Sequence, residues 1–371
     1  MTAIQQRVCV GMSGGVDSSV AAYLLKQQGY DVIGLTFRGW PQDCRSVKED
    51  RCCGPQAVAD ARMVAHSLQI PHYVIDEIDS FQREVMDYFA AEYRRGRTPS
   101  PCIICNEKVK FGSLLRKAQA LGAERIGTGH YARVTTQKLN HRGHREENGV
   151  QYQLLRARDQ RKDQSYFLFS LSQQQLSRVM FPLGHLTKEE VRAIAKDVGL
   201  KTYGKEESQE VCFVPENDYR RFLRESGVTE RKGELVTKDG RVVGYHAGVH
   251  NFTVGQREGL NLGGLKQPLY VIELDAANNR VVVGPAEELL RDQFEAANCV
   301  WHVAAESETG ALECRVKIRS NAEPVRANVV IPSLSRNLCR VQLSEPQRAI
   351  TPGQAAVFYQ DDTVIGGGWI C

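Results

Sequence analysis

The sequence predicts an α/β fold: a doubly wound domain with a parallel sheet, followed by a small β module and a C-terminal β-barrel. Two observations carry this prediction. In the first part of the chain, short β-branched runs alternate with helical patterns, as in doubly wound domains. Beyond about Gly204, strands punctuated by glycine replace most of the helices. A length of 371 residues suits two or three domains, which we place at 1–208, 209–290 and 291–371.

The first domain is expected to begin with a strand, a helix and a second strand, because β-branched runs flank a segment of helical spacing that Gly29 ends. The same patterns then repeat. The expected strands are Arg7–Val10, Asp31–Phe37, His72–Ile75 and Arg125–Gly127. The expected helices are Asp17–Gln28, Pro55–Leu68, a long helix capped by Asp79 that runs through Tyr93, and Val109–Leu121. Ligand sites of such sheets lie beyond the carboxyl ends of the strands, where Ser13–Ser19 and Thr128–Tyr131 fall.

After a short helix near Asp218–Arg224, the rest of the chain is expected to be mainly β-structure. The expected strands are Gly233–Val236, Arg241–Gly244, Tyr270–Glu273, Arg280–Val283, Glu313–Ile318 and Ala356–Tyr359. The polar stretch Gln137–Gly149 has no periodicity, so it is expected to be an exposed loop. Its basic residues could face solvent or touch RNA.

A segment rich in glycine and serine, Ser13–Ser19, stands between the first expected strand and the first expected helix. Adjacent glycines let backbone N–H groups turn toward an anion, serines add hydroxyl donors, and a helix N-terminus adds partial positive charge. The segment therefore predicts a phosphate site, with an ordinary turn as the alternative. No lysine lies between Gly11 and Lys26, so transfer of a terminal phosphoryl group by a kinase-type loop is not favoured.

This segment resembles the PP-loop of the ATP pyrophosphatase superfamily. Members of that superfamily cleave ATP between the α- and β-phosphates, adenylate a carbonyl oxygen and release pyrophosphate. The resemblance implies that the loop binds ATP and that Asp17 acts together with Mg²⁺. The ATP-binding residues it implies are Gly11, Met12, Ser13, Gly14, Gly15, Val16, Asp17 and Ser18.

The composition is ordinary for a globular protein, with 42% hydrophobic and 25% charged residues. No apolar run approaches the about 20 residues of a membrane span, and the N-terminal residues have none of the features of a signal peptide. We therefore expect a cytoplasmic, monomeric protein with no membrane partner. Its 11 cysteines should then include nucleophiles or ligands rather than a disulfide framework. A net charge of +4 permits nucleic-acid binding without requiring it.

Two cysteine segments carry the candidate chemistry. Cys105 follows the proline-rich loop Thr98–Pro101 and is expected just ahead of a helix, whose N-terminus would lower the pKa of a thiol and favour a nucleophile. Cys212 lies far along the chain and can meet Cys105 only through the fold. Two other interpretations stay open. Cys102 and Cys105 could be half of a zinc site, and Cys212 could be an inert buried thiol.

Motifs along essentially the whole chain resemble those of the bacterial tRNA-specific 2-thiouridylases. They are Gly11–Ser19, Gly96–Pro99, Cys105-Asn106, Lys110-Phe111, Thr128–Tyr131, Lys162–Leu168, Cys212-Phe213, Gly255–Leu260 and Thr351–Gln354. The resemblance implies an enzyme that uses ATP to adenylate O2 of the wobble uridine of tRNA. It then replaces that oxygen with sulfur, which arrives through a sulfur-carrier protein or cysteine desulfurase relay.

The resemblance also implies roles for single residues. Cys212 matches the cysteine that carries a persulfide, and Cys105 matches its partner nucleophile. Phe37 and Gly129 match contacts to ATP. Contacts to tRNA are implied at Ser100, Pro101, Cys102, His130, Lys162, Asp163, Gln164, Arg319, Ser320 and Gln354. Alternation along Arg315–Arg319 would place three basic side chains on one strand face, either against tRNA phosphates or as a solvated edge.

The chemistry implied for the uridine requires a carrier and a resolving thiol. Adenylation makes AMP the leaving group at C2. The sulfur would come from a persulfide on Cys212, either directly or as hydrosulfide that Cys105 releases from it while a transient disulfide forms. The uridine must also leave the anticodon stack to reach a buried pocket.

One departure from the family pattern concerns Cys102. Well-known members carry Asp-x-x-Cys where this chain has Cys102-Ile103-Ile104-Cys105, so the acid or base attributed to that aspartate is missing. Cys102, Cys105 and Cys212 are a set of the kind that holds a [4Fe–4S] cluster with one open iron, which could bind the sulfur. This mechanism stands beside the persulfide relay. The loop cysteines Cys44, Cys52 and Cys53 could also bind metal, whereas Cys299, Cys314, Cys339 and Cys371 lack ligand spacing and are expected to be structural.

Two other functions share some of these features. Another adenylating enzyme of the superfamily, such as an amidating synthetase, would share the phosphate loop without needing the pair of cysteines. A non-catalytic RNA-binding protein with a structural zinc site would not need the phosphate loop.

Overall fold

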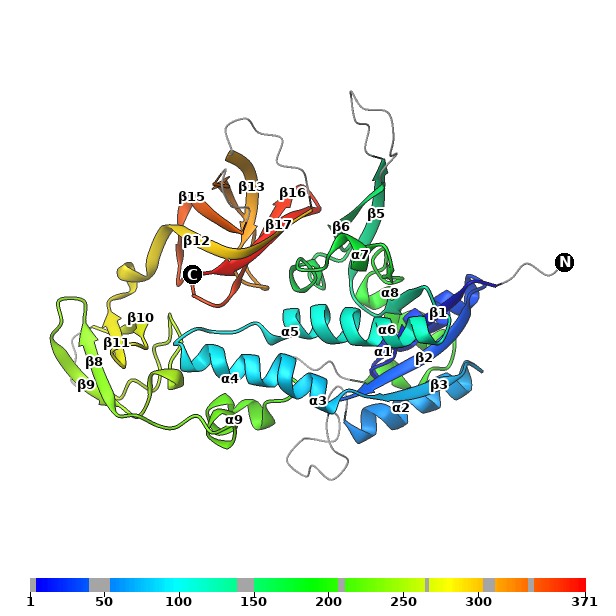
Figure 1. Ribbon diagram of the computed structural model, residues 1–371, viewed down its shortest axis with the longest axis horizontal. Helices are drawn as coiled ribbons and strands as arrows, with labels where there is room; N and C mark the ends of the chain where they lie inside the picture. The colour runs from blue at the N-terminus through cyan, green and yellow to red at the C-terminus, as the bar shows by residue number, and fades with distance from the viewer. Residues whose placement is uncertain are drawn as a thin grey trace. The chain divides into compact units, whose positions relative to one another are not determined.

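The computed structural model divides into two compact units. Figure 1 shows the helices and strands in chain order by colour. The structure describes residues 5–39, 54–138, 150–205, 211–263, 267–302, 311–332 and 337–371. The first unit comprises Met1–Val85, Cys102–Asn217 and Asp362–Ile365, and the second comprises Met86–Pro101, Asp218–Asp361 and Gly366–Cys371. The three domain boundaries expected from the sequence stay predictions.

The first unit is built on a parallel sheet with the strand order β3-β2-β1-β4-β7. The strands are β1 Arg7–Gly11, β2 Asp31–Arg38, β3 His72–Asp76, β4 Arg125–Thr128 and β7 Val179–Met180. The chain moves outward from β1 to β3 and then returns to the other side of β1 at β4. The direction of winding therefore reverses between β1 and β4, which is where ligands bind in doubly wound sheets. The predicted parallel sheet is confirmed.

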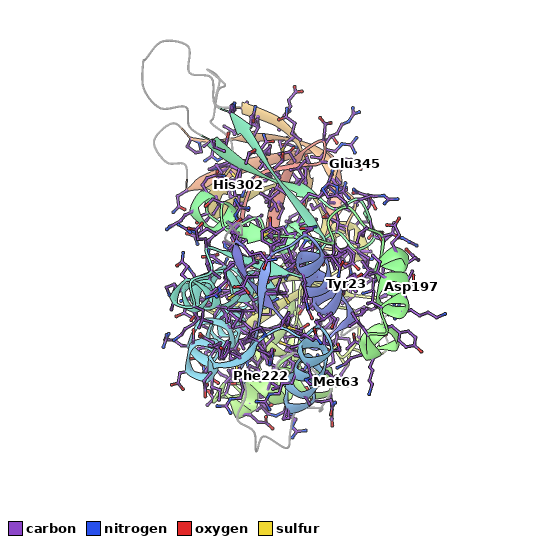
Figure 2. All side chains as sticks on the ribbon, turned by 90° about the vertical axis from the view of Figure 1, so that its right-hand side faces the viewer. Tyr23, Met63, Asp197, Phe222, His302 and Glu345 are labelled. Atoms are coloured by element: carbon purple, nitrogen blue, oxygen red, sulfur yellow. The ribbon has the colours of Figure 1, made fainter. Side chains whose placement is uncertain are left out.

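Helices cover both faces of β1. Helices α1 Val16–Gln27, α2 Pro55–Ser67 and α8 Lys188–Asp197 share a core with Val8 and Val10. Tyr23, Met63 and Asp197 mark these three helices in Figure 2. The opposite face of β1 meets α6 Leu114–Ala120, because a Cβ on Gly11 would lie 3.8 Å from the Leu114 side chain. The chain leaves α1 through Gly29 with a φ of +86°, as the predicted glycine stop requires.

Two helices differ from the prediction. The helix expected to be capped by Asp79 has Glu77 at its N-cap, so the assignment of Asp79 as the cap is wrong. It runs in three parts, α3 Ile78–Phe81, a π-helix Gln82–Met86 and α4 Asp87–Arg94. The helix expected at Val109–Leu121 begins earlier, as α5 Pro101–Ile104, a π-helix Cys105–Ser113 and α6. Pro101 suits the first position, where a missing N–H leaves no bond unmade. Within the described ranges, no helix is long and apolar enough to cross a membrane.

The first unit also contains an antiparallel hairpin that the sequence did not predict. Its strands are β5 Ala132–Lys138 and β6 Val150–Arg156, and α7 Gln173–Leu176 follows later in the chain. Thr363 and Val364, which belong to this unit, pair with Leu155 and Leu154 of β6. The expected exposed loop 137–149 begins at the end of β5, and its remaining residues lie outside the described part of the chain.

The second unit begins its β-structure after α9 Tyr219–Glu225, whose first turn is capped by the Asp218 carboxylate accepting from Arg221 N at 3.0 Å. A sheet with the order β10-β11-β8-β9 follows. Its strands are β8 Gly233–Thr237, β9 Val242–His246, β10 Tyr270–Asp275 and β11 Arg280–Gly284. These match the predicted strands with shifted ends.

The C-terminal strands form a closed barrel. Their order is β12-β15-β14-β13-β16-β17, and pairing of β12 with β17 closes the ring, so no edge is left open. The strands are β12 Leu290–Trp301, β13 Ala311–Lys317, β14 Val325–Val330, β15 Leu338–Arg348, β16 Ala355–Gln360 and β17 Thr363–Ile370. The predicted C-terminal β-barrel is confirmed.

Candidate active site

The predicted phosphate loop lies at the carboxyl end of β1, next to the reversal of the sheet. Met12, directly before this segment, is fixed through both its N–H and its carbonyl, because Met12 N donates to Leu35 O at 2.7 Å and Thr36 Oγ1 donates to Met12 O at 2.7 Å. Gly15 is the N-cap of α1 and has no side chain to bind the free N–H groups of the first turn. These donors are therefore available to an anion.

The serines of the loop mainly hold its shape. Ser18 Oγ accepts from Ser13 N at 3.1 Å and donates to Gly15 O at 3.1 Å, and Ser19 Oγ donates to Gly15 O at 2.8 Å. Ser18 and Ser19 are buried, as are Met12 and Val16, whereas Ser13 is exposed. Among the predicted ATP contacts that are buried, Ser18 already uses its hydroxyl within the loop.

Two glycines let the loop pack closely on its neighbours. Gly14 has a φ of +69°, and a Cβ there would lie 2.4 Å from Ala57 O of α2. Gly129, in the segment that follows β4, would place a Cβ 2.6 Å from Ser18 N at the start of α1. The segment after β4 is therefore in direct contact with the start of α1 at Gly129, and the loop after β1 is in direct contact with α2 at Gly14.

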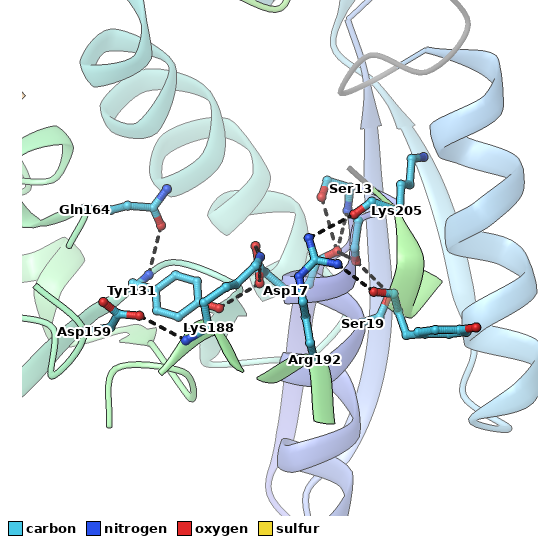
Figure 3. Close-up of polar contacts among 12 residues, drawn as sticks. Ser13, Asp17, Ser19, Tyr131, Asp159, Gln164, Lys188, Arg192 and Lys205 are labelled. Atoms are coloured by element: carbon cyan, nitrogen blue, oxygen red, sulfur yellow. Dashed lines mark hydrogen bonds and ion pairs between the residues drawn. The ribbon is translucent and has the colours of Figure 1, made fainter. Parts of the chain in front are cut away.

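Asp17 lies in a polar cluster that the sequence did not predict (Figure 3). Lys188 Nζ donates to Asp17 Oδ1 at 2.7 Å and to Oδ2 at 2.8 Å, and the Tyr131 hydroxyl donates to Oδ1 at 2.9 Å. Lys188 is the first residue of α8, where Thr187 and Glu190 form a capping box, and its own N–H donates to Asp159 Oδ2 at 3.1 Å. The buried ammonium group of Lys188 is thus held on Asp17 by a fixed helix end.

A second lysine reaches the loop from the same region of the chain. Lys205 Nζ donates to Asp60 Oδ2 at 2.6 Å and lies 3.5 Å from Gly14 O. Arg192 of α8 donates to Lys205 O at 3.3 Å and to Tyr203 O at 2.8 Å, which fixes this backbone (Figure 3). Sequence reasoning found no lysine within the loop and missed both of these, because no local spacing links either lysine to the loop.

Phe37, a predicted ATP contact, lies near the end of β2 in an aromatic row. Its ring centroid is 6.1 Å from that of Phe81 in α3, which meets Phe213 edge-on at 5.8 Å. Phe213 follows Cys212, so this row fixes the position of the Cys212 segment against α3. Residues 206–210 of the same motif lie outside the described part of the chain.

Cys105 does not lie ahead of a helix, and that expectation is wrong. The helical run begins at Pro101, so Cys105 lies one turn inside it and opens the π-helix Cys105–Ser113. Gln175 Nε2 donates to Glu107 O and to Phe111 O at 3.0 Å each, which satisfies carbonyl groups of the widened turn. π-Helical turns occur frequently at functional sites. This π-helix packs on α3, and Ser113 Oγ donates to Glu77 Oε1 at 2.6 Å.

The three cysteines considered as cluster ligands have different surroundings. Cys102 is exposed, Cys105 is buried and Cys212 is half-buried. Among the described residues, which include all three, no group of three histidine, cysteine or acidic side chains is arranged to hold a metal ion. The set therefore does not fit a [4Fe–4S] cluster or a zinc ion in this structure. Cys44, Cys52 and Cys53 lie outside the described residues.

Of the predicted tRNA contacts in the first unit, two hold the site together. The Asp163 carboxylate is fully buried and accepts from Ala157 N at 3.0 Å and Ser165 Oγ at 2.8 Å. Gln164 Oε1 accepts from Tyr131 N at 2.9 Å. Lys162, by contrast, is half-buried at the start of this segment.

His130, another predicted tRNA contact, follows Gly129 in the segment after β4. Its Nδ1 shares a hydrogen bond with Thr128 Oγ1 at 2.7 Å. Burial, and then the positive charge of Lys110, hold the pKa of His130 well below its ordinary value of 6.5. The imidazole is therefore neutral at physiological pH.

The predicted tRNA contacts of the second unit fall in two places. Gln354 Nε2 donates to Thr98 O at 3.0 Å and to Pro99 O at 3.3 Å, beside the buried Ser100 and Pro101. Arg319 donates to Ala349 O at 2.7 Å and to Thr351 Oγ1 at 3.2 Å, and Ser320 follows it in the turn after β13.

The basic strand face expected from Arg315 to Arg319 is wrong. The strand ends at Lys317, which is 5% exposed, and Arg319 lies in the turn beyond it. Within β13, Lys317 is buried whereas Arg315 is exposed.

Comparison with known proteins assigns the chain to a family. Three family profiles match in order, described as tRNA methyl transferase HUP domain over residues 6–216, tRNA methyl transferase PRC-barrel domain over 220–285, and Aminomethyltransferase beta-barrel domain over 291–370. The tRNA-specific 2-thiouridylase MnmA of Geobacter metallireducens is 48% identical over 371 residues, which cover 99% of this chain and 97% of that protein. Its namesake from Koribacter versatilis is 46% identical over 379 residues, covering 99% of each. The chain belongs to the tRNA-specific 2-thiouridylase family.

In this member of the 2-thiouridylase family, the HUP-domain profile spans the phosphate loop, Cys105 and Cys212. A solved 4-thiouridine synthetase–RNA complex with bound ATP aligns with 59% of this chain and 50% of that chain, at 17% identity and a TM-score of 0.34.

Proposed function

We propose that this protein catalyses the ATP-dependent 2-thiolation of the wobble uridine of tRNA. The main support is the phosphate loop at the reversal of the sheet, in a chain that matches 2-thiouridylases over 99% of its length. The profile descriptions mention methyl transfer, but the loop offers free backbone N–H groups to an anion, and the chain carries the two cysteines that sulfur transfer needs. Both features suit adenylation followed by thiolation.

In this proposal the phosphates of ATP bind the loop 11–18 and the N-terminus of α1. Lys188 positions Asp17, and Lys205 positions the Gly14 backbone. Each ammonium group is itself paired with a carboxylate, Lys188 with Asp17 and Lys205 with Asp60, so in this structure the two lysines act by positioning the loop. In this structure the Asp17 carboxylate accepts from Lys188 at both oxygens and from Tyr131 at Oδ1, and these bonds do not use every acceptor position of the carboxylate. Mg²⁺ therefore stays a prediction, and no step below uses it.

The first chemical step activates C2 of the uridine. O2 of the base attacks the α-phosphorus of ATP, and pyrophosphate leaves. The adenylated base then carries AMP as the leaving group at C2, whereas the unmodified carbonyl oxygen is a poor leaving group. The donors of the loop stabilise charge that develops on the departing pyrophosphate. Tyr131 and Gln164 hold the segment after β4 against the loop, where the base would be presented.

The second step brings sulfur from a carrier protein or cysteine desulfurase relay to Cys212 as a persulfide. The Cys105 thiolate attacks the Cys212 sulfur, the sulfur–sulfur bond breaks, and hydrosulfide leaves as a disulfide forms. Hydrosulfide attacks C2, and AMP departs. A thiol reductant then returns two electrons to the disulfide. Support comes from packing, because the π-helix that Cys105 opens and Phe213, next to Cys212, both contact α3.

The remaining assignments stay predictions. They are the contacts of tRNA with Ser100, Pro101, Cys102, His130, Lys162, Asp163, Gln164, Arg319, Ser320 and Gln354, the monomeric state and the cytoplasmic location. A [4Fe–4S] mechanism receives no step, because the three cysteines do not fit a cluster.

Exchange of labelled pyrophosphate into ATP, measured with and without bulk tRNA, tests the proposal. We expect exchange that depends on tRNA and that Asp17→Ala abolishes while tRNA binding persists. Asp31→Ala is the control, since its ion pair with Arg7 lies on the surface at the start of β2. Exchange without tRNA would favour an amidating synthetase, and the absence of exchange would favour a non-catalytic RNA-binding protein.

A further inference from the structure

The barrel brings together two cysteines that the sequence assigned only structural roles. Cys299 of β12 and Cys339 of β15 lie on neighbouring strands, with their Sγ atoms in hydrogen-bond contact at 3.6 Å. Cys339 is fully buried, whereas Cys299 is half-buried. Cys299 is therefore the more exposed residue of the pair.

A bulge in β12 creates this contact. The register of β12 against β17 shifts between Ala297 and Val300, and Asn298 has a φ of +52°. Regular pairing places Ala296, not Cys299, opposite Cys339. The extra residue of the bulge thus turns the Cys299 thiol back toward β15.

The contact also makes the two thiols unequal. The side-chain contact with Cys339 lowers the pKa of Cys299, and the same contact together with burial raises the pKa of Cys339. Cys299 thus has the character of the attacking thiolate, and Cys339 that of the resolving thiol. Cys314, in the same barrel, has a pKa raised to about 12 by burial and lacks this character.

We propose that Cys299 and Cys339 form an oxidation site that closes to a disulfide in the presence of a peroxide. The Cys299 thiolate attacks one peroxide oxygen, the oxygen–oxygen bond breaks, and a sulfenic acid forms as hydroxide leaves. Cys339 sulfur then attacks the sulfenic sulfur and displaces the second oxygen as water. The two thiols lose two electrons and two protons, and the peroxide becomes two waters. Closure needs the sulfur atoms to approach by about 1.5 Å, since a disulfide bond is about 2.05 Å long.

The site is linked to a predicted tRNA contact through β17. A Cβ on Gly368 would lie 2.7 Å from Cys299 Sγ, so this thiol rests on the β17 backbone. At the end of β17, Ile370 O accepts from Gly353 N and Ile370 N donates to Gln354 O, both at 2.9 Å. Movement of Cys299 during closure is expected to shift Gln354 and weaken tRNA binding. This second part rests on the proposed function, whereas formation of the bond does not.

The experiment treats the full chain with hydrogen peroxide and maps disulfide-linked peptides by mass spectrometry. We expect a peptide pair joined through Cys299 and Cys339 in the wild type and in the control Cys314→Ser, but not in Cys299→Ser or Cys339→Ser. Circular dichroism checks that each variant folds, and Cys299→Ala serves if the serine variant does not. Absence of the linked pair, with other cysteines oxidised in the same sample, would overturn the site.

Filter binding of tRNA to the same samples tests the second part. We expect oxidation to weaken binding about fivefold, the lower end of typical coupling between sites, and dithiothreitol to restore it. Cys339→Ser should show no such change. Linked protein that binds tRNA as well as reduced protein would overturn the link through β17. If the wild type binds no tRNA in either state, the proposed function fails while the peptide map still decides the oxidation site.

Discussion

Replacement of Gly14 with alanine tests whether the phosphate loop depends on close packing against α2. At Gly14 the φ is +69°, and an added Cβ would lie 2.4 Å from the backbone oxygen of Ala57. Left-handed backbone costs an alanine about 1–2 kcal/mol. Displacement of the α2 backbone adds the cost of overpacking, about 1–3 kcal/mol. We therefore expect Gly14→Ala to lower the free energy of unfolding by about 2–5 kcal/mol.

Gly29→Ala is the matched control. Its φ is +86°, and no atom lies within 4 Å of the added Cβ, so only the conformational cost of about 1–2 kcal/mol applies. Urea unfolding of both variants gives the difference, and AMP formation with ATP and tRNA gives the functional effect. Gly29→Ala should keep wild-type AMP formation under folding conditions, whereas Gly14→Ala should lose it because the loop N–H groups are displaced. Equal losses of stability, or normal AMP formation by Gly14→Ala, would refute the reasoning.

Three further predictions follow from the same unit. Lys188→Met leaves the Asp17 carboxylate without its cation, so urea unfolding should show that the free energy of unfolding falls by about 1–3 kcal/mol. The double variant Lys188→Met/Asp17→Asn should recover most of this free energy. If the effects of the two substitutions simply add, the pairing is contradicted. The pKa of His130 is lower in the folded protein than in the unfolded chain. The unfolded chain therefore binds a proton first as the pH falls below 6.5, and the free energy of unfolding decreases by up to about 1.4 kcal/mol per pH unit. His130→Gln should flatten the dependence of unfolding free energy on pH between about 6.5 and 5, and an unchanged slope would refute the assignment. Cys102→Ser should retain partial thiolation with a persulfide donor under anaerobic conditions, whereas joint loss of bound iron and thiolated tRNA would restore the cluster mechanism.

Local sequence was enough to predict the features that depend on neighbouring residues. The β-branched runs around Ser13–Ser19 predicted the strand, loop and helix, and the structure places them at β1, the phosphate loop and α1. Gly29 predicted the end of α1, because only a residue without a Cβ adopts its backbone conformation at low cost. The glycine-punctuated strands likewise predicted the change to β-structure in the second unit.

Local sequence did not predict the π-helix, because a π-helical turn changes the backbone hydrogen bonds while the spacing of the apolar residues stays close to that of an α-helix. The residues Cys105–Ser113 have helical composition, but the π-helix there is supported by Gln175, which lies far along the chain and donates to two of its carbonyl groups. The helix start at Pro101 was likewise missed, and with it the true position of Cys105 inside the helix.

The sequence by itself determined the strands and helices around the phosphate loop, the loop itself and the candidate cysteines, since each depends on residue types and spacing over a few residues. Only the tertiary structure decided which side chains from distant parts of the chain contact each other and which are buried. It paired Lys188 with Asp17 and Cys299 with Cys339, and it buried Lys317 while it left Arg315 exposed. The physical reason is that these contacts form when the sheet and the barrel close. Closure brings together residues that are distant along the chain, and no periodicity records such pairs.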